Sequence, residues 1–493
     1  MSKVFKLDTI FRKDIYHFYI LFMVSIVLRY YLPRPIGNVY FFGILIALYL
    51  TKRNYFFIAF IFLIIHSPGF LFYPYGNYSL PGFGIAGTER SISYAELFLF
   101  VTLIKTFSIE KETKLFYKVP LTLLFIYFIF LFLISVVQDM PFLKLMKTIR
   151  MFIPFLFFYS IPRLMQTKEA YAKLFNLLFA TIPILVLAQL TDIITGKYLA
   201  SYFGDYVSKF AVSSGTDEVF FNPSERTVRT IYGINILLIS YIMAIYYYVN
   251  KERYFSKGYL LSIISLCLLS VMLSATRGWI ISFIFMLCTF LIIYFRNIVG
   301  VIKGFSLPGL LFGIVLLLFP IIVVQLTNVF QRIGTLFNLL SGDMSAGGTL
   351  IRITKRMPRV MSKFWDSPVF GYGFTEDYFK YVDGHLGHQS MLINGGIVGY
   401  SLFMIFFGYF LLKLFNLKAN VSRQYKNILW IFIIGFIGIF IAHSTSTMIF
   451  SYQVSVTTGL MISLFFIFAD FNYKQIRLSS RSKHKSQLSA IIK

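Results

Sequence analysis

The chain has 493 residues, of which 58% are hydrophobic and 13% are charged, and its mean hydropathy is +0.74. Soluble domains are about half apolar and a quarter charged, so this composition excludes a soluble globular protein. The net charge of +26 would suit nucleic acid, but the basic residues lie in short clusters between apolar runs, as membrane topology requires. We therefore expect a chain embedded in membrane lipid, with no nucleic-acid partner.

Apolar runs recur along the chain and are long enough to cross a bilayer as helices. Residues 121–137 and 428–442 are examples. Backbone groups in lipid must be paired within the protein, and the runs lack the alternation of a β-barrel, so helices are expected. The sequence predicts an all-α polytopic membrane protein with about 12–14 transmembrane helices. The number stays open because the runs near residues 43, 99 and 157 are short or interrupted.

Basic clusters predict which side of the membrane each segment faces. Lys3, Lys6, Arg12 and Lys13 precede the first run, and no small-residue cleavage site follows it, which is typical of an anchor helix with its N-terminus inside. More than half of the 46 basic residues then fall in alternate segments, and both termini come out cytoplasmic. We expect a multi-pass protein of a bacterial plasma (inner) membrane, with its active face periplasmic or extracellular.

One long outer segment divides the chain into four predicted parts. Residues 1–327 form an N-terminal transmembrane bundle, and residues 328–389 form a large periplasmic or extracellular loop. Residues 390–470 form C-terminal transmembrane helices, and residues 471–493 form a basic cytoplasmic tail. We find no matching pair of broken helices in two halves, the pattern that points to a secondary transporter.

The large loop contains a predicted amphipathic helix over residues 349–365. Pro358 removes an N–H group and predicts a kink or two short helices. The basic face suits either anionic lipid headgroups or a pyrophosphate, because the planar fork of arginine forms two parallel bonds to phosphate. At about 100° per residue, five basic residues share one face, namely Arg352, Lys355, Arg356, Arg359 and Lys363.

His388 lies at the outer mouth of the span that follows the loop. Histidine titrates near neutrality and can accept a proton from a sugar hydroxyl; the alternative is a hydrogen-bonded surface residue. His385 and His388 could also be metal ligands, but no carboxylate or cysteine completes a recognisable site nearby, and we expect no metal and no other cofactor.

Three arginines lie at other outer mouths. Arg277 sits in a short turn between two spans, where an arginine at bilayer depth is costly and marks a functional site unless it reaches the headgroups. Arg226 and Arg229 lie at another mouth. His66 and His443 fall within spans and are interpreted as groups that bridge helices.

These residues together resemble the O-antigen ligase and O-antigen polymerase family of membrane glycosyltransferases over about residues 226–403. Order and spacing carry the resemblance more than any single motif. The motifs are, in chain order, Ser274-x-x-Arg277-Gly278, Ser345-x6-Arg352, Ser367-Pro368-x-Phe370-Gly371-x-Gly373-Phe374, His388-Gln389 and Ile393-x-x-Gly396-Ile397-x-Gly399.

The resemblance implies a fold like that of the third glycosyltransferase class (GT-C), a polyprenyl-diphosphate-linked glycan as donor, and a glycan or a lipid core as acceptor. It assigns catalysis to Arg277, Arg352 and His388. Arg229 matches the arginine of the family's second outer loop, and Arg226 and Arg356 are further candidates for substrate binding. Gln389 is also a substrate-binding candidate, although the family often has asparagine there.

The predicted function is therefore a metal-independent inverting glycosyltransferase that polymerises or ligates lipid-linked oligosaccharide for a surface polysaccharide (O-antigen, capsule or exopolysaccharide). Polymerase is favoured over ligase on family frequency alone. The alternative is a lipid-linked-glycan flippase, which the collection of cations at one face disfavours. Membrane lipids are expected partners, and other membrane proteins of polysaccharide assembly are candidates.

Overall fold

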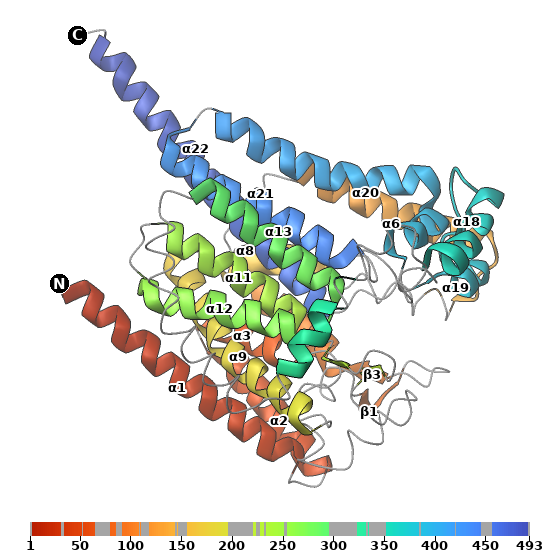
Figure 1. The fold of residues 1–493 in the computed structure, drawn as a ribbon, viewed down its shortest axis with the longest axis horizontal. Coiled ribbons are helices and arrows are strands. Elements are labelled where there is room, and N and C mark those ends of the chain that lie inside the picture. The colour runs from red at the N-terminus through yellow and green to blue at the C-terminus, as the bar shows by residue number, and fades with distance from the viewer. Residues whose placement is uncertain are drawn as a thin grey trace. The chain divides into compact units, whose positions relative to one another are not determined.

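The computed structural model describes residues 2–30, 34–51, 53–64, 79–84, 91–107, 109, 118–142, 145, 155–195, 220–222, 227–230, 233–250, 254–294, 323–331, 334, 352–383, 386–419, 421–444 and 456–491. These residues are almost entirely helical, apart from two short antiparallel hairpins. The hairpins are β1 (Ser79–Gly84) with β2 (Ser91–Ser93), and β3 (Phe220–Asn222) with β4 (Thr227–Arg229). The predicted all-α polytopic fold class is confirmed (Figure 1).

Four described helices are long and apolar enough to cross a membrane. They are α6 (Lys118–Val137), α9 (Lys168–Thr195), α20 (Gly387–Ala419) and α21 (Arg423–Ser444). Shorter apolar helices are α11 (Ile234–Val249), α12 (Lys257–Leu273) and α13 (Arg277–Tyr294). The count of about 12–14 spans stays a prediction, because several of the apolar runs lie partly or wholly outside the described residues.

The chain divides into two compact units. Unit 1 comprises residues 1–111 and 159–334, and unit 2 comprises residues 112–158 and 335–493. Besides α9, α11, α12 and α13, unit 1 holds α1 (Ser2–Tyr30), α2 (Arg34–Leu50), α3 (Asn54–Ile64), α5 (Tyr94–Phe107) and most of α8 (Phe157–Leu164). The boundaries of the four predicted parts stay predictions.

In unit 1, α9 is the central helix and packs against α1, α3, α11 and α12. Its Gln189 is fully buried. The Gln189 amide donates to Thr230 Oγ1 at 3.1 Å and accepts from the Ser270 hydroxyl at 2.6 Å. A polar side chain is tolerated at this depth because both ends of its amide are paired.

Unit 2 holds α6, α20 and α21, together with α22 (Val456–Ile491). Between α20, α21 and α22 lies an aromatic cluster, whose closest pair is Phe410 and Phe466 with ring centroids 4.4 Å apart. Phe436 contacts both rings, at 5.0 and 5.6 Å. Tilted and edge-on ring pairs of this kind add to the free energy gained from apolar burial, so these helices form one packed core.

Most of the large loop belongs to unit 2, and short helices alternate with turns among its described residues. A five-residue π-helix, η5 (Arg352–Arg356), leads directly into α18 (Met357–Asp366), and α19 (Glu376–Tyr381) follows. Pro358 falls in the first turn of α18, where a missing N–H group does no harm. The helix changes from π to α between Arg356 and Met357, next to the position where Pro358 predicted a kink or two short helices.

Candidate functional site

Helix α20 is broken at Gly396, about two and a half turns after its start at Gly387. Gly396 has φ 60° and ψ −165°, a backbone conformation that is essentially restricted to glycine. A Cβ atom there would collide with the backbone of Val369 and with the Phe370 nitrogen, the latter at 2.5 Å. The lack of a side chain at Gly396 therefore allows the loop that contains Val369 and Phe370 to pack directly against the break.

That loop, Ser367–Phe374, closes on the break through main-chain hydrogen bonds, and we call it the clasp loop. The N–H groups of Tyr372 and Gly373 donate to the carbonyls of Ile393 and Asn394, at 2.9 and 2.8 Å. These carbonyls end the first half of α20 and would lack helical partners because of the break. The clasp loop supplies the missing donors.

The second half of α20 is capped by the same loop. The N–H groups of Ile397 and Val398 donate to the carbonyls of Pro368 and Val369, at 2.8 and 3.1 Å. Backbone groups on both sides of the break are thus paired in a region that must exclude unpaired polar groups. The glycine-rich motif and the glycines of α20 form one interlocked structure.

Helix α6 forms hydrogen bonds with both the clasp loop and α20. Tyr127 donates its hydroxyl to Asn394 Oδ1 at 3.1 Å, and Asn394 Nδ2 donates to the Gly373 carbonyl at 2.6 Å. The Phe374 N–H donates to Ser135 Oγ at 2.7 Å. Three elements of unit 2 are therefore joined through buried polar contacts, and Figure 1 shows α6 running beside α20.

Helix α18 docks by its apolar face. Val360 and Phe364 are buried, at 0% and 4% exposure, whereas the apolar side chains of Ile353 and Met357 are 50% and 37% exposed. α18 contacts α20 and α19. The apolar face is thus divided, with its C-terminal part packed on protein and its N-terminal part open.

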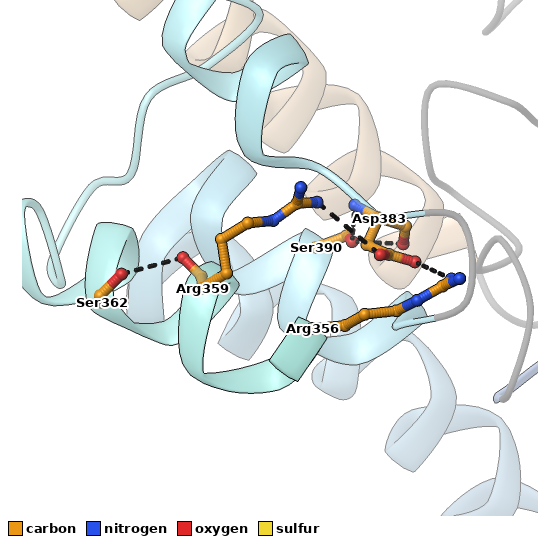
Figure 2. Close-up of polar contacts among 5 residues, drawn as sticks. All are labelled: Arg356, Arg359, Ser362, Asp383 and Ser390. Carbon is orange, nitrogen blue, oxygen red and sulfur yellow. Dashed lines mark hydrogen bonds and ion pairs between the residues drawn. The ribbon is translucent and has the colours of Figure 1, made fainter. Parts of the chain in front are cut away.

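Two arginines of the basic face share one carboxylate (Figure 2). Arg356 and Arg359 approach Asp383 at 3.4 and 3.8 Å. The Asp383 side chain is only 9% exposed, while the arginines are 39% and 53% exposed. The carboxylate therefore lies beneath the guanidinium groups, which keep an open side.

Asp383 is itself tied to the start of α20. Its N–H donates to Ser390 Oγ at 3.2 Å, and the Ser390 hydroxyl donates to the Asp383 carbonyl at 2.9 Å. Because Ser390 follows His388 by two residues, the basic face of α18 is held close to the first turn of α20.

Lys363 ends the basic face and is fully paired. Its ammonium lies 2.9 Å from Asp377 and 3.4 Å from Asp366, and 4.6 Å from the centroid of the Tyr372 ring. The hydrogen bond with Asp377 raises the pKa of Lys363, since a nearby carboxylate favours the charged amine. By contrast, Lys355 is exposed and has no ion pair within the described residues.

His388 is half-buried in the first turn of α20. Its Nδ1 lies 3.0 Å from the hydroxyl of Tyr400, and its ring packs against Phe440 of α21 with centroids 5.2 Å apart. Nε2 makes no hydrogen bond within the described part of the chain. One nitrogen is thus held and the other is available, as proton transfer from a bound hydroxyl requires.

Residues 260–404 match the model of the O-antigen ligase family. The predicted family resemblance is confirmed over this segment, and with the apolar helices it supports a membrane glycosyltransferase of the O-antigen ligase type. No curated protein and no solved structure matches the chain.

The O-antigen ligase segment contains Arg277, Arg352, Arg356, His388 and Gln389, together with the clasp loop. Arg352, Arg356, His388 and Gln389 lie in unit 2, whereas Arg277 lies in unit 1. The structure brings the basic face of α18 and the start of α20 together through Asp383 and Ser390. The roles assigned to these residues stay predictions.

Arg277 is the first residue of α13 and is half-buried. The turn before it is tight, with Ala275 at φ 52° and the Ser274 hydroxyl bonded to the Val271 carbonyl at 2.7 Å. Arg229 ends β4 opposite Phe220. Three other residues singled out by the sequence lie outside the described residues, namely His66, Arg226 and His385.

Asp383 and Tyr400 are contacts of the O-antigen ligase segment that the sequence did not predict. Tyr400 is twelve positions from His388, a separation that never brings side chains together on an unbroken helix. The available signal was Gly395-Gly396-x-x-Gly399, because two adjacent glycines inside an apolar run mark a break or a close approach.

Proposed function

We propose that this chain transfers a glycan from a polyprenyl diphosphate carrier to an acceptor hydroxyl at the periplasmic or extracellular face of the plasma membrane. The observation that carries the proposal is the geometry of the half-buried His388. Its Nδ1 is hydrogen-bonded to Tyr400 while Nε2 can accept a proton, and its helix α20 packs against the basic helix α18. The family match supports the reaction class. An available imidazole nitrogen and a row of arginines are what a hydroxyl nucleophile and a diphosphate leaving group need.

The proposed reaction is a single displacement. The acceptor oxygen attacks the anomeric carbon of the donor glycan, and the bond from that carbon to the diphosphate breaks. The hydroxyl proton passes to Nε2 of His388, and the diphosphate leaves on its lipid with the bonding electrons. Attack opposite the leaving group inverts the anomeric centre, and this chemistry does not require a metal.

Arg352 is the proposed partner of the diphosphate. It is the first residue of η5 and is half-buried, and its planar guanidinium can form two parallel charge-assisted bonds to phosphate. Charge placed where the leaving group becomes negative lowers the barrier. We further propose that Arg277 takes part in catalysis, and that Arg226, Arg229, Arg356 and Gln389 contact the substrate.

The acceptor decides whether the protein is a polymerase or a ligase. A second lipid-linked repeat would make it a polymerase, and a lipid core or another terminal acceptor would make it a ligase. We favour the polymerase. In a deletion strain, single repeats that accumulate on lipid would identify a polymerase, and long unattached chains would identify a ligase. Intermediates left on the inner face would instead identify a flippase.

The proposed roles of His388 and Arg352 are tested with three variants expressed in the deletion strain. His388→Ala and Arg352→Ala are expected to abolish glycan transfer, with membrane levels and detergent elution unchanged. Lys355→Ala is the control, because it removes an unpaired exposed charge from the same helix and should leave transfer within about twofold, as expected of a surface change. Normal polysaccharide in both the His388 and Arg352 strains would overturn the assignment.

A further inference from the structure

His388 and Tyr400 are in contact although they lie twelve positions apart in α20. At a rise of about 1.5 Å per residue, an unbroken helix would place their backbones about 18 Å apart. The observed distance from Nδ1 to the hydroxyl is 3.0 Å. The break at Gly396 is therefore what brings the two side chains together, and the clasp loop maintains that break.

We propose that Tyr400 is a positioning residue for His388, which fixes its tautomer with the proton on Nδ1. This inference rests on the function proposed above and deepens it. In the proposed arrangement Nδ1–H donates to the tyrosine oxygen. The lone pair of Nε2 then faces outward, where it can accept the proton of the acceptor hydroxyl.

The chemistry of the two groups suits these roles. Neutral imidazole has one donor nitrogen and one acceptor nitrogen, and the bond made by one decides the state of the other. A neutral phenol oxygen is a far weaker base than imidazole, so it accepts a hydrogen bond from Nδ1–H and leaves the proton on the ring. When Nε2 gains its proton, the bond from Nδ1 becomes charge-assisted and stronger. Tyr400 thus favours the charged state of the reaction.

Among the described residues, Tyr400 alone forms a hydrogen bond with Nδ1 of His388. Phe440 of α21 covers the ring. His443 lies three residues further along α21, is buried, and has an Nε2 without a hydrogen-bond partner. Asp383 precedes α20 but faces Arg356 and Arg359. The tyrosine is therefore the group that can orient this imidazole.

The first test reads the tautomer directly and needs no activity. Full-length protein labelled with 15N-histidine is studied by NMR in nanodiscs, and His388→Asn identifies the signal of His388. We expect the neutral ring to carry its proton on Nδ1, and Tyr400→Phe to move it toward Nε2. Tyr409→Phe is the control on the same helix, where the ring contacts Lys413. A proton on Nε2 in the unchanged protein, or no response to Tyr400→Phe, would overturn the inference.

The second test separates positioning from substrate binding. With purified protein and lipid-linked donor, Tyr400→Phe should lower kcat about tenfold to a hundredfold, less than the loss of a general base itself. KM for the acceptor should stay within about twofold, since only the transition state is affected. An unchanged kcat contradicts the role of Tyr400, whereas full activity of His388→Ala contradicts the proposed function and leaves the NMR result standing.

Discussion

Asp383 controls the charge of the basic face. Its carboxylate lies under Arg356 and Arg359 and is mostly shielded from solvent, so it neutralises part of the face that was predicted to hold a pyrophosphate. A carboxylate at this depth needs cationic partners, because an unpaired buried charge is costly.

We predict that Asp383→Asn weakens the docking of α18. The substitution keeps the shape of the side chain and removes its charge, and the partners are half exposed, so the loss should be about 1 kcal/mol. The measurement is the apparent melting temperature in detergent, with Arg356→Gln to close a double-mutant cycle.

Asp366→Asn is the matched control for that cycle. Asp366 pairs with Lys363 but is 63% exposed, and exposed pairs contribute little. If Asp383→Asn and Asp366→Asn lower the melting temperature equally, the buried carboxylate of Asp383 stabilises the loop no more than an exposed carboxylate does.

At the scale of elements, the packing of the clasp loop against α20 explains why both segments contain glycines. Gly371 and Gly373 have φ of 67° and 57°, and a Cβ on Gly371 would meet the Gly396 nitrogen at 2.5 Å. On the other face, a Cβ on Gly395 or Gly399 would press into the ring of Tyr127. Small residues allow membrane helices to approach closely, so the glycines serve both the break and the contact with α6.

We predict that Gly396→Ala disrupts unit 2 locally. Backbone strain at such a position costs about 1–3 kcal/mol, and the collision with Val369 adds to it. The melting temperature should therefore fall well below that of the unchanged protein. Glycan transfer should be lost because the side chains of His388 and Tyr400 separate.

Gly408→Ala provides the comparison on the same helix. A Cβ at Gly408 meets no atom within 4 Å, so alanine should be neutral or stabilising by up to about 1 kcal/mol. Equal melting temperatures for the alanine variants at 396 and 408 would contradict the account of the clasp.

Local patterns predicted the elements better than the contacts between them. The spacing of Arg352, Arg356 and Arg359 indicated one helical face, and Pro358 indicated where the helix divides. The pairing of that face with Asp383 depends on how the loop folds back, which no local period encodes. The contact between His388 and Tyr400 was missed for a similar reason, since an apolar run reads as one straight span.

On the scale of the whole molecule, the O-antigen ligase segment begins in unit 1 and ends in unit 2. Composition was sufficient to predict a helical membrane protein, because a chain this apolar can be solvated only by lipid. Orientation is a separate matter. It rests on the positive-inside rule applied to short basic segments, and it decides on which side His388 and the basic face meet their substrate.

We predict that the loop faces outward and that both the N-terminal segment and the connection between α20 and α21 face the cytoplasm. Single cysteines at Trp365, Gln424 and Lys13 test this, since all three side chains are exposed. Cys288 is exposed and is first replaced by serine, whereas Cys267 is buried and can remain. In spheroplasts, a membrane-impermeant maleimide should label only Trp365→Cys. In inverted vesicles it should label only Gln424→Cys and Lys13→Cys, because the clusters around them contain the cations that resist translocation. Labelling of Gln424→Cys in spheroplasts would reverse unit 2 in the membrane and place the proposed chemistry on the wrong side.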